Sequence, residues 1–145
     1  MLFRSDAGSI LSALGSLYIQ ERRLAEAGQA LDRALEIFSR AKDAVPMDRI
    51  KILHVRGVLY ARQGDWLSAE RELRDALLLS DSEPWIDPLA LRSLLSSYAI
   101  VLRKNHHGRE ARSIEARAAA IQTDNKKAAI VDFTELLPKA KPAKK

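Results

Sequence analysis

The stretch GVLYARQGDWLSAERELRDAL, from Gly57 to Leu77, decides the fold. It places a glycine and a tyrosine three positions apart, then a turn at Gly64, then the alanines Ala69 and Ala76. Apolar residues recur at intervals of three and four on both sides of the turn. This spacing indicates two helices joined by a tight turn rather than strands.

The same order of residues returns 42 positions earlier and 42 positions later. The upstream copy, GSLYIQERRLAEAGQALDRAL, begins at Gly15, and the downstream copy, AIVLRKNHHGREARSIEARAA, begins at Ala99. Three copies at one fixed period predict a helical repeat array. The third copy departs most from the pattern, because Glu115 stands where the first two have Leu31 and Leu73. We therefore expect the last helix to be a polar cap of the array.

This order of small residue, aromatic residue, turn and paired alanines resembles the tetratricopeptide repeat. The 42-residue period is similar to the long-helix repeats of kinesin light chains and of many bacterial proteins. The resemblance covers about residues 8–125 and implies an all-α fold, a right-handed α-solenoid of three helix–turn–helix repeats at about 8–49, 50–91 and 92–125. Residues 126–145 are expected to form a short amphipathic segment and a Lys-rich, disordered tail.

Proline and cap residues set the expected helix boundaries. Pro46 and Pro88, also 42 apart, each suit the first turn of a helix. The first helices of the three pairs are expected at about 5–20, 46–63 and 88–105, and the second helices to end near residues 43, 82 and 123. The close contact within each pair is expected to join two sets of small residues: Gly15, Gly57 and Ala99 on the first helices, and Ala27, Ala69 and Ala111 on the second.

The charge of the chain is concentrated at its C-terminal end. The net charge is +5, and residues 126–145 carry most of it, with six lysines against Asp132 and Glu135. The repeat region is therefore nearly neutral, which argues against a nucleic-acid surface spread over the fold. The chain has no cysteine and no long apolar run. It also shows no secretory signal, so the expected location is cytoplasmic.

The resemblance implies a groove lined by the first helix of each repeat. The residues at its expected groove positions are Ser12, Ser16, Lys51, His54, Val58, Arg62, Ser96, Ile100 and Arg103. Serines and apolar residues with basic edges suit an extended or helical peptide of some acidic character. A solvated face without a ligand is the alternative. Ser12 and Ser16 stand where a clamp for a C-terminal carboxylate needs Lys and Asn, so binding of that type is not expected.

Other residues that attract attention have ordinary interpretations. His106 and His107 are adjacent on a turn and point apart, so exposed turn residues are expected rather than a metal site or a general base. Trp66 is expected to pack the turn as part of the core, with a role as an aromatic anchor as the alternative. Trp85 is expected to be half exposed, either as a rim contact or as a plug of its loop.

The face of the first helix that carries Ile10 and Leu17 lacks a partner in the expected array. Their counterparts one and two periods later are Ile52 with Leu59 and Leu94 with Val101, which the second helix of the preceding repeat should cover. Only about seven residues lie upstream of Gly8 in this sequence, too few for a helix that could cover the face. We therefore expect another chain to cover the face, as a homodimer through this helix, or the array to be part of a longer one.

The sequence predicts a non-catalytic scaffold that binds a peptide or protein through its groove or its ends. No phosphate loop, nucleophile elbow or zinc-protease motif occurs, and no catalytic residue, metal ligand or cofactor site is expected. The alternative is binding of an anionic surface or nucleic acid through the Lys-rich tail. A tail of this kind would lose affinity steeply with salt.

Overall fold

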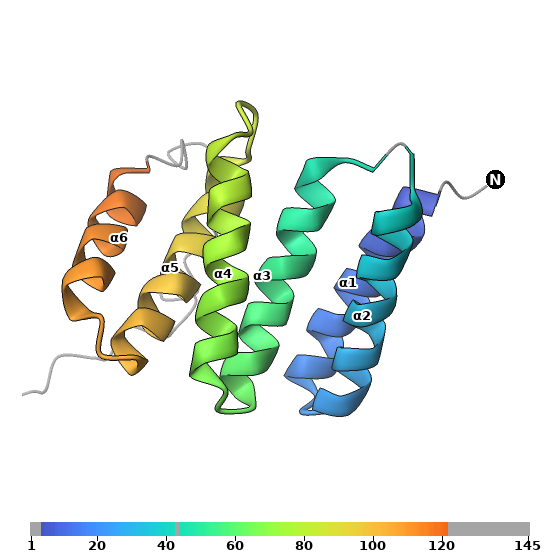
Figure 1. The fold of residues 1–145 in the computed structure, drawn as a ribbon, viewed down its shortest axis with the longest axis horizontal. Helices are drawn as coiled ribbons and strands as arrows, with labels where there is room; N and C mark the ends of the chain where they lie inside the picture. The colour runs from blue at the N-terminus through green and yellow to red at the C-terminus, as the bar shows by residue number, and fades with distance from the viewer. Residues whose placement is uncertain (1–3, 43, 122–145) are drawn as a thin grey trace, which may run out of the picture.

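The computed structural model describes residues 4–42 and 44–121, and within them the fold is entirely helical. Its six helices are α1 (Arg4–Gln20), α2 (Leu24–Arg40), α3 (Pro46–Arg62), α4 (Trp66–Asp81), α5 (Pro88–Lys104) and α6 (Gly108–Ala120). They form three antiparallel hairpins that follow one another along the long axis of the molecule (Figure 1). The predicted all-α repeat solenoid is confirmed.

Each hairpin contacts only its neighbours in the array. Within a hairpin α1 packs on α2, α3 on α4 and α5 on α6, and α2 then contacts α3 as α4 contacts α5. The first helices also touch one another, α1 with α3 and α3 with α5, whereas α2, α4 and α6 make no such contacts. The array therefore bends toward its first helices. We call the side formed by α1, α3 and α5 the A-helix face.

All three hairpin turns use the same backbone geometry. Arg22, Gly64 and His106 have positive φ angles of 61°, 81° and 65°, and they lie exactly one period apart. The next residue in each turn donates its N–H to a carbonyl five positions earlier, as in Asp65 to Tyr60 at 2.9 Å. This bond closes the end of the first helix. The first turn thus keeps the repeat geometry although it has no glycine.

Caps and prolines start the helices where the sequence indicated. Pro46 and Pro88 occupy the first turns of α3 and α5. The Asp87 carboxylate accepts a hydrogen bond from the N–H of Ala90 at 2.9 Å, which satisfies one free donor of α5. Asp65 does the same at the start of α4 with the N–H of Ser68. The second helices are shorter than expected, since α2 ends at Arg40 and α6 at Ala120.

The close contact inside each of the first two hairpins joins a glycine to a leucine, and the prediction that Ala27 and Ala69 enter it was wrong. A Cβ added to Gly57 would lie 2.5 Å from Cγ of Leu73, and one added to Gly15 would lie 2.8 Å from Cγ of Leu31. The leucine side chains therefore fill the space that the glycines leave. Only a residue without a side chain fits opposite them.

The interfaces between hairpins bury the faces that the period predicts. Ile52 and Leu59 of α3 are fully or almost fully buried and cluster with Leu31 and its neighbours on α2. Leu94 and Val101 of α5 are equally buried, in a cluster with residues of α4. The core is thus a series of adjoining clusters. The second helix of a hairpin covers the first helix of the next hairpin, as α2 covers α3 and α4 covers α5.

Candidate peptide-binding groove

A row of hollows follows the A-helix face from α1 to α5. The first lies between α1 and α3, and the second adjoins it, sharing Ser16 and Val55. The third lies among α3, α4 and α5 and shares Val58, Arg62 and Ser97 with the second. The fourth lies between α5 and α6 and shares Ile100 with the third. Because each hollow shares residues with the next, they form one groove.

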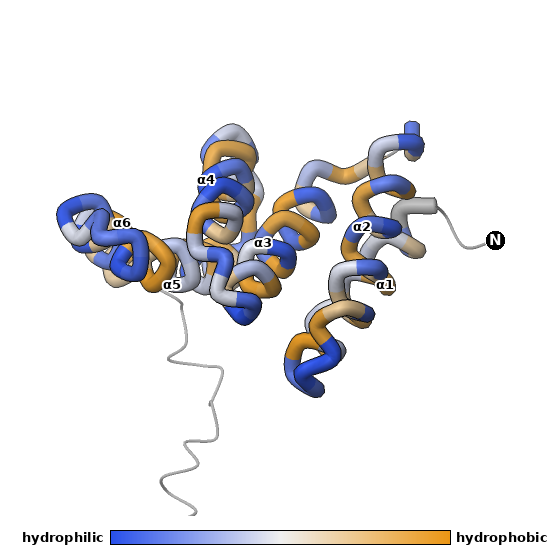
Figure 2. Tube along the Cα trace, turned by 60° about the horizontal axis from the view of Figure 1, so that its bottom comes forward, coloured by the Kyte–Doolittle hydropathy of each residue, from blue (hydrophilic) through white to orange (hydrophobic). Residues whose placement is uncertain are grey.

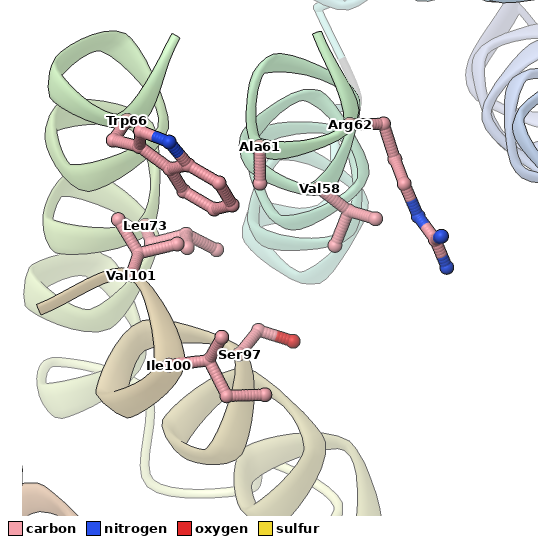
Figure 3. Close-up of a pocket in the computed structure, with 8 residues that line it drawn as sticks. All are labelled: Val58, Ala61, Arg62, Trp66, Leu73, Ser97, Ile100 and Val101. Carbon is pink, nitrogen blue, oxygen red and sulfur yellow. The ribbon is translucent and has the colours of Figure 1, made fainter. Parts of the chain in front are cut away.

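The third hollow, which we call the central hollow, is the most apolar part of this groove. It has a volume of about 360 Å³ and is lined by Val58, Ala61, Arg62, Trp66, Leu73, Ser97, Ile100 and Val101. In Figure 3 the Trp66 ring forms one wall, Val58 and Ile100 lie on opposite sides of the opening, and the Arg62 side chain extends away from the tryptophan. Such a hollow suits an apolar side chain with a charged neighbour.

The packing of two hairpins builds the central hollow. Val58 and Ala61 come from α3, Trp66 begins α4, and Ile100 lies on α5. Ile100 is 59% exposed, whereas its helix neighbour Val101 is buried. The register of α5 therefore divides two adjacent apolar residues between the core and the groove.

The hollows include most of the groove residues that the sequence predicted. Eight of them line one or more hollows: Ser12, Ser16, Lys51, His54, Val58, Arg62, Ser96 and Ile100. The ninth, Arg103, lines none of these hollows and forms a bidentate pair with Glu115, at 2.6 and 2.7 Å. Ser12 is almost fully buried, so its hydroxyl is poorly placed to reach a ligand. Their role as ligand contacts stays a prediction.

The groove carries basic groups at its edge. Lys51 is exposed at the first hollow, and Arg62 is exposed between the second and third. Within the described part of the chain neither side chain forms an ion pair, while Lys104 lies over the Trp66 ring, 5.3 Å from its centroid. Asp48 at the first hollow accepts a hydrogen bond from Ser9. The edge thus offers cations to an acidic ligand.

His54 contributes a polar but uncharged group to the second hollow. Burial lowers the pKa of this imidazole below its usual value, which favours the neutral form at pH 7. Its Nε2 atom lies 2.9 Å from the Ser97 hydroxyl, so the ring joins α3 to α5 across the groove floor. The imidazole is therefore partly buried at the floor of the groove.

The adjacent histidines differ in their surroundings. His106 takes the positive-φ position of its turn, and Nδ1 of His107 lies 3.2 Å from the Glu70 carboxylate. Glu70 is almost fully buried and also accepts a hydrogen bond from Asn105, at 2.5 Å, and pairs with Arg74. This network ties the third turn to α4. Sequence spacing gave no signal for the link to the turn, because Asn105 and His107 lie 35 or more positions from Glu70.

The two tryptophans also have separate environments. Trp66 packs against the core, as its first predicted interpretation has it, and it also forms a wall of the central hollow. Its role as an aromatic anchor for a ligand stays a prediction. Trp85 is 90% exposed, and the prediction of a half-exposed loop residue was wrong. The described residues therefore leave its ring almost uncovered.

Several predictions concern features that the structure describes only in part. None of the six described helices has the length and apolar character needed to cross a bilayer. Within residues 4–42 and 44–121 no group of three or more acidic or histidine side chains is arranged to hold a metal ion. The predicted amphipathic segment and the Lys-rich tail lie outside the described residues.

Comparison with known proteins identifies the repeat. The family model of the tetratricopeptide repeat matches residues 6–82, which include the first two hairpins and slightly more than half of the chain. Proteins of this family generally mediate protein–protein interactions and typically act as non-catalytic scaffolds. Searches of curated proteins and of solved structures found no match. The likeness to kinesin light chains stays a prediction.

Proposed function

We propose that this chain, which belongs to the tetratricopeptide repeat family, is a non-catalytic scaffold that binds an extended segment of a partner protein along its A-helix face. The observation that carries the proposal is the continuity of the four hollows, with the apolar central hollow inside the row. A groove of this shape offers an anchor for one side chain and a path for the backbone on both sides of it.

The dimensions of the groove set the length of the segment. Packed helices lie about 8–10 Å apart, so the path from α1 to α5 is roughly 20 Å long. An extended chain advances about 3.3 Å per residue, and six or seven residues therefore span the groove. A leucine, isoleucine or phenylalanine near the middle of the segment fits the walls that Trp66, Val58 and Ile100 supply.

The charges at the groove edge select an acidic segment. Lys51 and Arg62 lie on the same helix, eleven positions or about three turns apart, and both are exposed. Lys51 borders the first hollow and Arg62 the second and third, so aspartate or glutamate on the α1 side of the apolar anchor would meet them. Such edge charges contribute to association rate and to the choice of partner more than to affinity.

Selection of peptides tests the proposal directly. We expect the full chain to enrich, from a random displayed library, sequences that combine one large apolar residue with flanking acidic residues. Binding of a selected peptide, measured by fluorescence anisotropy, should fall about tenfold or more in Lys51→Glu/Arg62→Glu, since two attractive contacts become repulsive. The variant Arg33→Glu/Arg109→Glu changes the net charge equally on α2 and α6 and should bind normally.

A second pair of variants tests the apolar anchor. Ile100→Ser removes one side of the central hollow, and Leu78→Ser removes an equally exposed apolar side chain from α4. Only the first should weaken the peptide. The proposal would be contradicted if binding survived both groove variants but was lost on removal of residues 139–145. A steep dependence of that binding on salt would then assign it to the Lys-rich tail.

A further inference from the structure

The outward side of α1 is an apolar surface on which no other described helix packs. Ile10 and Leu17 lie two turns apart on it and are 56% and 48% exposed, with the exposed Ala13 between them. We call these three residues the α1 outer face. Two large aliphatic side chains in water on one helix face are unfavourable, because burying each would contribute about 1.5–3 kcal/mol.

The repeat shows what covers this face elsewhere in the molecule. One period later Ile52 and Leu59 are 0% and 4% exposed, because α2 packs on them. Leu59 reaches α2 at Gly28, where an added Cβ would lie 3.7 Å from its Cδ2 atom. Two periods later α4 covers the same positions of α5. The α1 outer face thus has the composition of an interior helix face, although no described helix packs on it.

The two ends of the array differ in charge as well. Between Asp6 and Glu21 the fourteen residues of α1 include no charged side chain. The thirteen residues of α6 include five: Arg109, Glu110, Arg112, Glu115 and Arg117. In Figure 2 α6 carries extended blue stretches, while α1 is mostly pale and orange until its last turn. An end repeat that faces water needs a polar outer side, and only α6 supplies one.

We propose that a second copy of this chain covers the α1 outer face, by pairing α1 with α1 about a two-fold axis. An uncharged surface can meet an identical surface without repulsion between like charges, and a self-complementary contact closes after two copies. Ala13 lies midway between the two large side chains, where a small residue lets the helix axes approach. Ala13 also lines the first hollow of the groove, but the pairing does not require that a peptide binds there.

A head-to-tail arrangement suits the two ends less well. It would bring α6 of one copy against α1 of the next, as α4 packs on α5 within the chain. At the position of Leu73 in α4, α6 carries Glu115, which already pairs with Arg103. Burying this pair against Ile10 and Leu17 would remove both charges from water at a large cost. The two-fold arrangement leaves α6 exposed.

The size of the face predicts a weak dimer. A helix of seventeen residues is roughly 25 Å long, and a contact of one helix per copy is smaller than the interfaces of stable complexes, which bury about 800 Å² per partner. We therefore expect a dissociation constant in the micromolar range, so that monomer and dimer interconvert. The molar mass from sedimentation equilibrium should rise with concentration toward twice the chain mass of 16.2 kDa.

Matched variants assign the dimer to this face. Ile10→Glu/Leu17→Glu should be monomeric at every concentration, while Leu67→Glu/Leu78→Glu, which changes two exposed leucines of α4 in the same way, should dimerise like the wild type. All four positions are exposed, so the helical circular dichroism signal should be unchanged. A wild type that stays monomeric up to about 1 mM, or a dimer that persists in Ile10→Glu/Leu17→Glu, would overturn the proposal.

Disulfide trapping tests the two-fold geometry. The chain has no cysteine, so Ala13→Cys introduces a single thiol on the face, and Ala25→Cys places one on the exposed side of α2 as a control. Mild oxidation should convert Ala13→Cys to a covalent dimer and leave Ala25→Cys largely monomeric. Equal trapping of the two variants, or trapping of Ala13→Cys only when it is mixed with Ala119→Cys on α6, would contradict pairing of α1 with α1.

Discussion

The second and third hairpins share one register of residues but differ at their closest contact. In the second, Gly57 on α3 receives the Leu73 side chain of α4. In the third, Ala99 takes the place of the glycine, and Glu115 takes the place of the leucine. Both partners have changed together: a methyl group has been added on one helix, and the side chain that would meet it has become a glutamate that points to solvent and Arg103.

The difference teaches that the glycine is needed only where a leucine faces it. Glycine within a helix costs about 1 kcal/mol relative to alanine, so it persists where an added Cβ would clash. Among the described helices only α5 packs on α6, and a buried leucine there would have little to cover. The third hairpin therefore replaces an apolar contact by an exposed ion pair and ends the core.

The largest expected effect is on the glycine contact of the second hairpin. Gly57→Ala adds a Cβ 2.5 Å from Cγ of Leu73, and overpacking of this kind costs about 1–3 kcal/mol, partly offset by the better helix propensity of alanine. Urea unfolding should show a net loss of stability. Gly108→Ala adds a Cβ in open space and should cause no loss.

A double-mutant cycle sharpens this result. In a Leu73→Ala background the clash is absent, so Gly57→Ala should there stabilise the protein by up to about 1 kcal/mol. The sign of its effect thus reverses. If Gly57→Ala destabilises equally in both backgrounds, the Gly57–Leu73 contact is not the reason for the glycine, and the comparison with Ala99 loses its basis.

A smaller effect is expected at the turns. Gly64 of the second hairpin and His106 of the third both have positive φ, a conformation that costs a non-glycine residue about 1–2 kcal/mol. Gly64→Ala should lower the melting temperature, and His106→Gly should raise it slightly, because relief of strain exceeds the added entropy of the unfolded chain. Gln63→Gly, at a φ of −81°, is the control and should only destabilise. A His106→Gly variant that melts below the wild type would contradict this account.

The smallest effect is expected for the ion pair that replaces the leucine. Hydrogen bonds from Arg103 lower the pKa of Glu115, so the pair contributes stability above the ordinary pKa of glutamate and loses it as the pH falls through the lowered value. Both side chains are exposed, so Glu115→Gln should destabilise only slightly at pH 7, and less in high salt. The melting temperatures of variant and wild type should converge in acid. A difference in melting temperature that is equal at all pH values would show that the ion pair does not stabilise the third hairpin.

The repeat made the fold predictable from the sequence. A period of 42 residues, two prolines in phase and one Gly-Asp turn were enough to place six helices within three residues of their observed ends. The period also predicted which faces of α3 and α5 are buried. The contact between Gly57 and Leu73 was assigned to the wrong residue, because spacing shows that a small residue has a close neighbour but not which side chain that is.

The groove was predictable in outline and not in detail. Phase along the A helices gave the residues that line the hollows, since it fixes the direction in which each side chain points. The phase could not reveal that Arg103 pairs with Glu115, or that Trp66 of α4 lines the central hollow. Both depend on contacts between helices, as does the network around Glu70. Such contacts leave no regular spacing in the sequence.

The most direct test of groove binding is a map of amide chemical shifts in the full chain as a selected acidic, apolar peptide is added. The account predicts that the largest changes fall on α3 and α5 around Val58 and Ile100, extend to Ser16 on α1, and are small on the exposed sides of α2 and α6. Changes confined to α2, α4 and α6, or to residues 122–145, would contradict it.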